Sequence, residues 1–257
     1  MLTGFLDYRN RLCKDRIKYE KGKNMYSYDS RVGFSQVDAD QKITINGIID
    51  YFQNASTFHS EDLGVGYDYL LPRDLVWVIN TWQVDIIRYP KYLERVKVTT
   101  TPYKFRAFIG YRNFTLETED GEILVKANSM WSLINLSTMK PAVVPEELPG
   151  IYGSAEPMDM DYQNGRIRLP NDAEEKGRLR VERHFLDPNK HMNNGQYINI
   201  AASCLPEGFE IKRLRAEYRN QAFLGDEITV MAGSCDGKYM VSLNNAEGKP
   251  YSVIEFS

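Results

Sequence analysis

The chain has 257 residues, of which 42% are hydrophobic and 26% charged, with a formal net charge of -3. This length and hydrophobic content suffice for one large domain or two domains of ordinary size. Because acidic and basic residues are mixed and nearly balanced, the chain lacks the basic field that nucleic-acid binding requires, and a nucleic-acid partner is disfavoured.

Cysteine spacing and hydropathy indicate the cellular compartment of the protein and the kinds of site that it lacks. Cys13, Cys204 and Cys235 are scattered without the CxxC spacing of a zinc site or a redox motif. We therefore expect a reducing, cytoplasmic location with neither a disulfide framework nor a bound metal. No apolar run approaches the roughly 20 residues that cross a membrane, so no membrane span is predicted.

Residues 1–24 differ from the rest of the chain. They are charged and contain neither the apolar core nor the small-residue cleavage site of a signal peptide. The strand-like pattern begins only after Met25. We predict an N-terminal extension outside the fold, which is either a frayed, disordered segment or the product of a start codon assigned too early.

A first unit is predicted over residues 25–148. It begins with a strand and an Asp-containing turn, RVGFSQVDADQK, followed by a helical pattern in which Ile45, Ile48, Ile49 and Phe52 form one apolar stripe. Four β-rich segments follow, and an Asp-Gly turn signal precedes the last of them. These segments cover residues 76–87, 94–105, 108–120 and 123–136.

Residues 149–177 are rich in Gly, Pro, Asp and Asn and have no hydrophobic period, so we predict a linker. The second unit, residues 178–257, then repeats the order of the first. RVERHFLDPNKH aligns without a gap with RVGFSQVDADQK and matches Asp38 with Asp187. A shorter helical pattern follows at residues 193–203, and β-rich segments follow at residues 211–223, 226–235 and 239–256.

A strand, a helix and several long antiparallel strands, arranged in this order twice, predict an α+β fold. Each unit would be a curved antiparallel sheet wrapped around a central helix, which makes the chain a tandem, or double, hotdog. Hotdog units pair through their sheets, and a tandem chain can satisfy that pairing within itself. We therefore expect a monomer or a homodimer.

Three segments resemble, in the same order, those of the acyl-acyl carrier protein thioesterases of plants and bacteria. The resemblance covers residues 26–257. The segment at residues 75–98 is similar to the family's stretch around an RYP tripeptide, and ANSMWSLINLSTMKP is similar to its A-S-x-W-x-x-M-N-x-x-T-R segment. The segment DPNKHMNNGQYI is similar to its D-x-N-x-H-x-N-N-x-x-Y-I motif.

This resemblance implies hydrolysis of the thioester between a fatty acyl chain and the phosphopantetheine arm of acyl carrier protein, which releases free fatty acid and ends elongation. No metal or cofactor is implied. The family's chemistry lies in the second unit, which names Asp187, Asn189 and His191 as catalytic residues. Where the family usually has Glu and Cys after an E-Y-R tripeptide, this chain has Gln221 and Ala222. We predict that Gln221 orients water or a neighbouring group, because an amide cannot act as a base.

From its residues alone, DPNKHMNN is typical both of a turn that begins a helix and of a catalytic site. Its counterpart in the first unit, DADQK, makes the turn without asparagine or histidine. Asp187 is expected to attack the thioester carbonyl directly or to activate water. His191 is expected to transfer protons, and Asn189 to hold the nucleophile or donate to the thioester oxygen.

The remaining candidates concern substrate and carrier. Phe52, Phe58 and Trp82 are predicted to line the acyl pocket. His59 and His184 are predicted to be structural, with His184 on a strand. Six basic side chains of the first unit are predicted to be mostly solvated surface, and some of them are candidates for contacting the acidic carrier protein. These residues are Lys91, Arg95, Lys97, Lys104, Arg106 and Arg112.

Two other functions compete with this one. Acyl-CoA thioesterase activity is the first, because related hotdog proteins use either carrier. A non-catalytic acyl-thioester-binding protein is the second. The second is disfavoured because residues 1–24 are too short for a DNA-binding domain and the polar set of the second unit is present.

Overall fold

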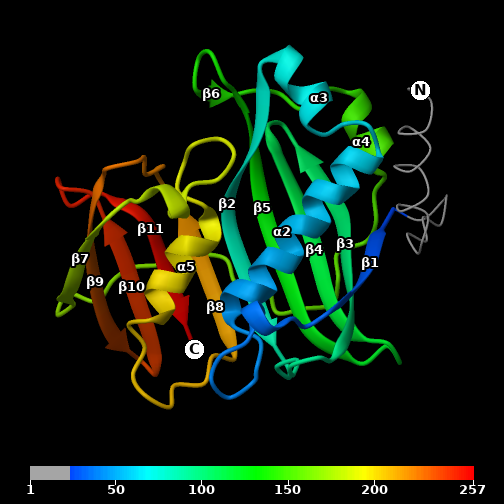
Figure 1. Ribbon diagram of the computed structural model, residues 1–257. Coiled ribbons are helices and arrows are strands. Elements are labelled where there is room, and N and C mark those ends of the chain that lie inside the picture. The colour runs from blue at the N-terminus through cyan, green and yellow to red at the C-terminus, as the bar shows by residue number, and fades with distance from the viewer. Residues whose placement is uncertain (1–23) are drawn as a thin grey trace, which may run out of the picture.

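The computed structural model describes residues 24–257, and nearly all of the predicted N-terminal extension lies outside the described residues. The strands form one antiparallel sheet of eleven strands in the order β1-β3-β4-β5-β2-β8-β11-β10-β9-β7, with the short β6 beside β5. Figure 1 shows two helices, α2 and α5, each lying across one half of this sheet. The predicted α+β fold, with a curved antiparallel sheet around each of two helices, is confirmed, and the two sheets are joined as halves of one.

The first half of the sheet surrounds the long helix α2 (Figure 1). Its strands are β1 (Tyr26–Arg31), β2 (Leu75–Ile86), β3 (Arg95–Arg106), β4 (Ile109–Thr118), β5 (Ile123–Asn135) and β6 (Lys140–Pro141). Its helices are η1 (Phe34–Gln36), α2 (Ile45–Asp62), α3 (Tyr67–Leu70), η2 (Leu71–Arg73) and α4 (Glu147–Tyr152). The four long strands agree with the sequence prediction to within two residues, because alternating apolar and polar positions define each of them.

The second half repeats this plan on a smaller scale. Its strands are β7 (Glu174–Arg180), β8 (Arg213–Tyr218), β9 (Glu227–Cys235), β10 (Lys238–Asn244) and β11 (Pro250–Phe256). Its helices are η3 (Arg183–Phe185) and α5 (Asn194–Ala202). Helix α5 has 9 residues whereas α2 has 18, so the second helix covers less of its sheet.

Strands β2 and β8 join the halves, with Thr81 opposite Glu217 and Asp85 opposite Arg213. The Arg213 guanidinium binds the Asp85 carboxylate through two hydrogen bonds of 2.6 and 3.0 Å. The two central helices also meet at their beginnings. A side chain on Gly195 of α5 would place its Cβ 2.5 Å from the Asn46 Oδ1 of α2, so the Asn46 side chain would have to move to admit any larger residue.

The core lies between each helix and its sheet. Ile48, Ile49 and Phe52 of the predicted stripe are fully buried. The Phe52 ring lies 5.1 Å from that of Phe114 and 6.2 Å from that of Trp82, measured between ring centroids. The helical period that predicted α2 therefore marks the face that packs on the sheet.

The segment before each turn departs from the prediction of a continuous strand. Strand β1 ends at Arg31, and a 3-10 helix, η1, follows. The side chain of Gln36 accepts a hydrogen bond from the Gly33 N–H at 2.9 Å, which closes this turn. The equivalent η3 contains His184, so the prediction of His184 on a strand is wrong. Its side chain is 67% exposed, as expected for a surface residue.

The segment predicted as a linker lies against the sheet. The Gln163 N–H donates to Gln83 Oε1 at 2.8 Å, and the Ile167 N–H donates to Glu217 Oε1 at 2.7 Å. Strand β7 begins at Glu174, inside the predicted linker. None of the helices in residues 24–257 is long and apolar enough to span a membrane.

Candidate active site

The turn between η3 and α5 is closed by the Asp187 side chain. Its Oδ1 accepts the N–H of Asn189 at 2.8 Å and the N–H of His191 at 3.1 Å. The Asp187 N–H donates to the His191 carbonyl at 2.8 Å, and Lys190 adopts a left-handed φ of 65°. Asp187, Asn189 and His191 therefore extend from one rigid five-residue turn.

Helix α5 begins directly after this turn. Asn193 is its N-cap, and the Asn193 side chain accepts the Gly195 N–H at 2.8 Å. The helix starts within one residue of the predicted position. The positive end of its dipole lies beside the turn.

A second segment, just after β8, fixes the turn from the other side. The Met192 N–H donates to the Ala222 carbonyl at 2.9 Å, and the His191 ring packs edge-on against Phe223 with centroids 5.0 Å apart. Gln221 is half-buried and precedes this contact, so the backbone brings it next to the turn. Ala222 is fully buried, and its N–H donates to Tyr197 Oη at 3.0 Å.

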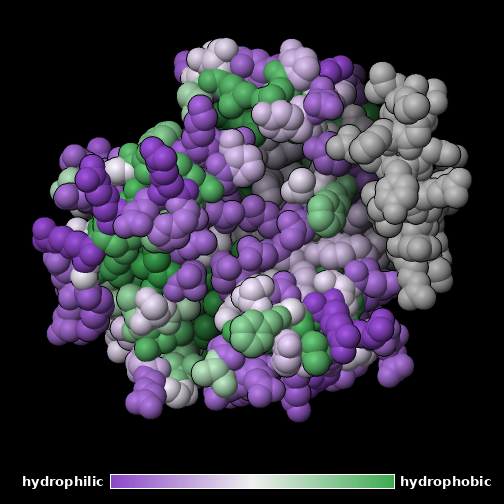
Figure 2. All heavy atoms as spheres, viewed as in Figure 1, coloured by the Kyte–Doolittle hydropathy of each residue, from purple (hydrophilic) through white to green (hydrophobic). Residues whose placement is uncertain are grey.

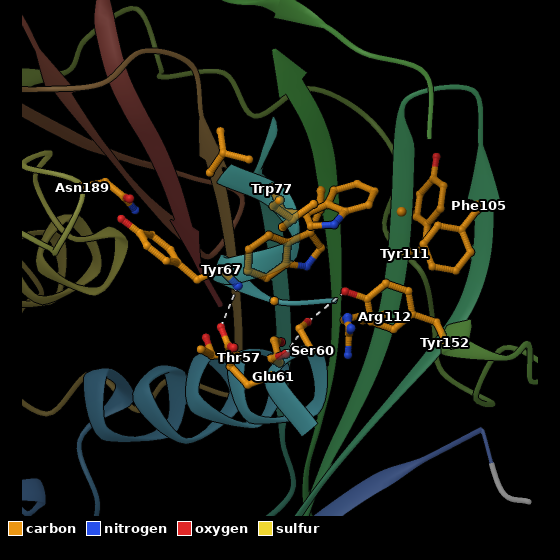
Figure 3. Close-up of a pocket in the computed structure, with 16 residues that line it drawn as sticks. Thr57, Ser60, Glu61, Tyr67, Trp77, Phe105, Tyr111, Arg112, Tyr152 and Asn189 are labelled. Atoms are coloured by element: carbon orange, nitrogen blue, oxygen red, sulfur yellow. Dashed lines mark hydrogen bonds between the residues drawn. The ribbon is translucent and has the colours of Figure 1, made fainter. Parts of the chain in front are cut away.

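A pocket of about 200 Å³ lies between α2 and strands β2, β4 and β5. Fifteen of its sixteen lining residues come from the first half of the chain, and the sixteenth is Asn189. Figure 3 shows Asn189 and Tyr67 at one end of the pocket and Arg112, Tyr152 and Phe105 toward the other. Figure 2 shows a hollow in the same region, below α3. The turn of the second half therefore reaches a pocket that belongs to the first.

The inner end of the pocket holds a buried cation. Arg112 of β4 is only 8% exposed, and its Nη1 donates to His59 Nδ1 at 3.0 Å. The guanidinium carbon lies 4.9 Å from the centre of the Tyr152 ring. Burial, and then the Arg112 charge, lowers the pKa of His59 to about 3, so this histidine is neutral and accepts the hydrogen bond. Burial also lowers the pKa of Arg112.

The prediction that Arg112 belongs to the solvated surface is wrong. In β4, Gly110, Arg112, Phe114 and Leu116 alternate and are all buried. Because side chains two apart share one face of a strand, Arg112 points to the same side as Phe114. This alternation is visible in the sequence and would have placed Arg112 inside.

None of the three aromatic residues predicted to line the acyl pocket is among the lining residues of this one. Phe52 and Trp82 pack on each other in the closed core, and Phe58 is 43% exposed with its ring against Tyr28. The pocket begins one helical turn beyond Phe52, at Ser56 and Thr57, which are small enough to leave space. Its aromatic walls come instead from Trp77, Phe105, Tyr111, Trp131 and Tyr152.

The first half contains a copy of the same turn. Asp38 Oδ1 accepts the N–H of Asp40 at 2.9 Å and the N–H of Lys42 at 3.0 Å, and Gln41 has a φ of 60°. The following helix again begins with a capping side chain, Thr44, which accepts the Gly47 N–H. Asp187 therefore has the same local role as Asp38.

Within residues 24–257, no three histidine, cysteine, aspartate or glutamate side chains are grouped as metal ligands.

Two sequence families match the chain. The N-terminal domain of acyl-ACP thioesterases matches residues 23–152, and the C-terminal domain matches residues 169–252. A chloroplastic acyl-acyl-carrier-protein hydrolase of Cuphea viscosissima is 25% identical over 87% of this chain and 57% of its own length. The chain spans about half the length of the curated relatives it matches.

Two solved structures share the fold. An acyl-ACP thioesterase from Bacteroides thetaiotaomicron superimposes with a TM-score of 0.83 and 21% identity, over 91% of this chain and 97% of that one. The 12:0-ACP thioesterase of Umbellularia californica superimposes with a TM-score of 0.79 and 20% identity, over the same shares. Both similarities show that this chain shares its double hotdog fold with solved structures.

Proposed function

Because the chain belongs to the acyl-ACP thioesterase family, we propose that it hydrolyses fatty acyl thioesters of acyl carrier protein and releases free fatty acid. One observation carries the proposal: Asn189 extends from the second turn into a pocket built by the first half of the chain. A thioester held at Asn189 would have its acyl chain in that pocket. The rigid turn and the start of α5 would then surround the reacting carbonyl.

The reaction proceeds by attack of water on the thioester carbon. His191 takes a proton from this water while the water oxygen forms a bond to the acyl carbon. The Asn189 amide and the N-terminal end of α5 stabilise the oxyanion that develops. The carbon–sulfur bond then breaks, His191 returns the proton to the departing thiolate, and the products are a carboxylic acid and a thiol.

Asp187 supports this chemistry through the turn. Its Oδ1 holds the N–H groups of Asn189 and His191, so both side chains keep their directions. The alternative is direct attack by Asp187 Oδ2, which would form a mixed anhydride, release the thiolate and require water to open the anhydride. A single turnover in oxygen-18 water that yields unlabelled acid would show this route with opening at the aspartyl carbon. A labelled acid is expected for water attack, and absence of a trappable acyl-enzyme would then exclude the anhydride.

The partner is acyl carrier protein, and its acidic surface would meet exposed basic side chains of the first half. Lys104 and Arg106 of β3 are both exposed and are the residues we propose for this contact. The double variant Lys104→Glu/Arg106→Glu is expected to raise KM for acyl-ACP and leave a short acyl thioester unaffected. Equal effects on both substrates would contradict the docking site.

A cytoplasmic location is proposed with this function, since Cys204 and Cys235 are both free thiols.

The test of the function is hydrolysis of matched substrates. The purified protein is incubated with acyl-ACP, acyl-CoA and acyl-N-acetylcysteamine of the same chain length, and released acid and thiol are both quantified. We expect the highest kcat/KM for acyl-ACP. A higher value for acyl-CoA would favour the CoA carrier, and binding of acyl chains without release of either product would refute hydrolysis.

A further inference from the structure

The pocket contains a positive charge that thioester hydrolysis does not use. Arg112 is more than nine-tenths buried, and its Nη1 is directed to the neutral His59 and, at 3.5 Å, to Thr100 Oγ1. Among the residues that the structure describes, no carboxylate is paired with Arg112. A buried guanidinium without an anionic partner is costly, because the charge loses its hydration and gains no counter-ion.

Other hydrogen-bonding groups gather around the same end of the pocket. The Tyr152 ring lies against the Arg112 guanidinium, and the Tyr152 hydroxyl shares a 2.9 Å hydrogen bond with Ser60 Oγ. A buried cation without an anionic partner, at one end of a cavity, favours an acceptor that carries negative charge.

A fatty acyl chain that ends in a methyl group provides no such acceptor. Its entry would leave the Arg112 charge without an anionic partner in a hydrocarbon environment. A carboxylate on the chain end would instead receive the guanidinium in the paired geometry that arginine favours. The thioester end would remain at Asn189, at the opposite end of the pocket (Figure 3).

We propose that this pocket selects acyl chains with a carboxylate at the far end, so that the preferred substrates are monothioesters of dicarboxylic acids and Arg112 determines this specificity. The inference rests on the proposed hydrolase function for the reaction itself. The preference for a terminal carboxylate follows from Arg112 alone and is measurable without hydrolysis.

The test compares matched pairs of N-acetylcysteamine thioesters across a series of chain lengths. Each pair has the same number of carbons, and one member ends in a carboxylate whereas the other ends in a methyl group. For the best length we expect a kcat/KM that is higher for the carboxylated member by about 30-fold or more, as for a buried charge pair. The variant Arg112→Met should remove or invert this preference.

Two further measurements separate folding from recognition. Arg178 of β7 is exposed and far along the chain from the pocket, so Arg178→Met is the control and should keep the wild-type preference. Thermal unfolding should show Arg112→Met to be about as stable as the wild type, because removal of a buried unpaired charge offsets the lost hydrogen bond to His59. If Arg112→Met does not fold, Arg112→Gln replaces it.

Binding of two unreactive amides, measured by calorimetry, provides the readout that does not depend on catalysis: the mono-N-methylamide of decanedioate, which ends in a carboxylate, and N-methyldecanamide, which ends in a methyl group. We expect tighter binding of the carboxylated amide by the wild type and equal binding of both by Arg112→Met. If no thioester is hydrolysed but this difference is found, the proposed function fails and the anion site stands. If methyl-ended thioesters are hydrolysed as fast as carboxylated ones and the carboxylated amide shows no advantage, the proposal for Arg112 is overturned and the hydrolase stands.

Discussion

The two Asp-containing turns have the same backbone and different surroundings. In each turn an aspartate Oδ1 accepts two N–H groups, the fourth residue has a left-handed φ, and a capped helix follows. Only the second turn contributes to the wall of the described pocket, through Asn189. The shared aspartate therefore accounts for the shape of the turn. A catalytic role of the second turn must come from the residues that differ, which are Asn189 and His191 in place of Asp40 and Lys42.

The difference in helix length has a related consequence. Helix α2 extends 18 residues and leaves a pocket against its C-terminal half, whereas α5 ends after 9 residues. The turn before α5 reaches this pocket through Asn189, so the side chains proposed for catalysis and the pocket come from opposite halves of the chain. The proposed site therefore depends on the pairing of the two units.

The largest effect is expected from His191. His191→Gln removes the group that moves the proton, and kcat should fall roughly 10²- to 10⁴-fold. Lys42→Gln at the equivalent position of the first turn is the matched control and should retain wild-type turnover. A similar loss in both variants, measured as acid released from acyl-ACP, would show that the two turns do not differ in function.

Asn189→Asp makes the second turn resemble the first at the position of Asp40. The turn is retained, because Asp187 binds the backbone N–H of residue 189 and not its side chain. The variant loses an oxyanion donor, and kcat should fall about 10²- to 10³-fold. The reciprocal Asp40→Asn should leave kcat unchanged. Normal turnover by Asn189→Asp would remove Asn189 from the catalytic set.

The buried histidine of the first half predicts a pH dependence that the exposed His184 should not share. Because the pKa of His59 is lowered to about 3 in the folded state, the unfolded chain binds more protons between about pH 6.5 and pH 3. This contribution to stability is complete above about pH 6.5 and is lost as the pH falls.

From pH 6.5 to pH 5 the loss should be about 2 kcal/mol, on a slope of about 1.4 kcal/mol per pH unit. Denaturant unfolding at several pH values measures it. His59→Gln keeps an acceptor for Arg112 and should flatten the curve, whereas His184→Gln should leave it as in the wild type. An unchanged pH dependence in His59→Gln would contradict the assignment.

The smallest effect is expected where the turns are alike. Asp38→Ala and Asp187→Ala each remove an oxygen that accepts two N–H groups, and each should lower the free energy of unfolding by about 1 kcal/mol. Turnover should fall only in Asp187→Ala, because only that turn positions Asn189 and His191. Unequal stability losses, measured by urea unfolding, would mean that the two aspartates differ structurally as well.

Local sequence patterns predicted most of the helices and strands. The apolar stripe of α2, the alternation of the long strands and the gapless match of Asp38 with Asp187 predicted the elements and their repetition. These features depend on residues that are close together in the sequence, so they can be recognised from a single sequence. The end of β1 and the position of His184 were mispredicted because a one-turn helix of three residues has no period to detect.

Two α+β units, the pair of turns and the residues in which the turns differ all follow from the amino-acid sequence. Only the folded chain shows that the second turn reaches a pocket, that Arg112 and His59 meet beside it, and that Phe52 and Trp82 pack on each other in the core. Asn189 and Arg112 are far apart in the chain and come from different halves. Their relation depends on how β2 pairs with β8 and how α2 packs on its sheet, and no local pattern records a contact between segments so distant in sequence.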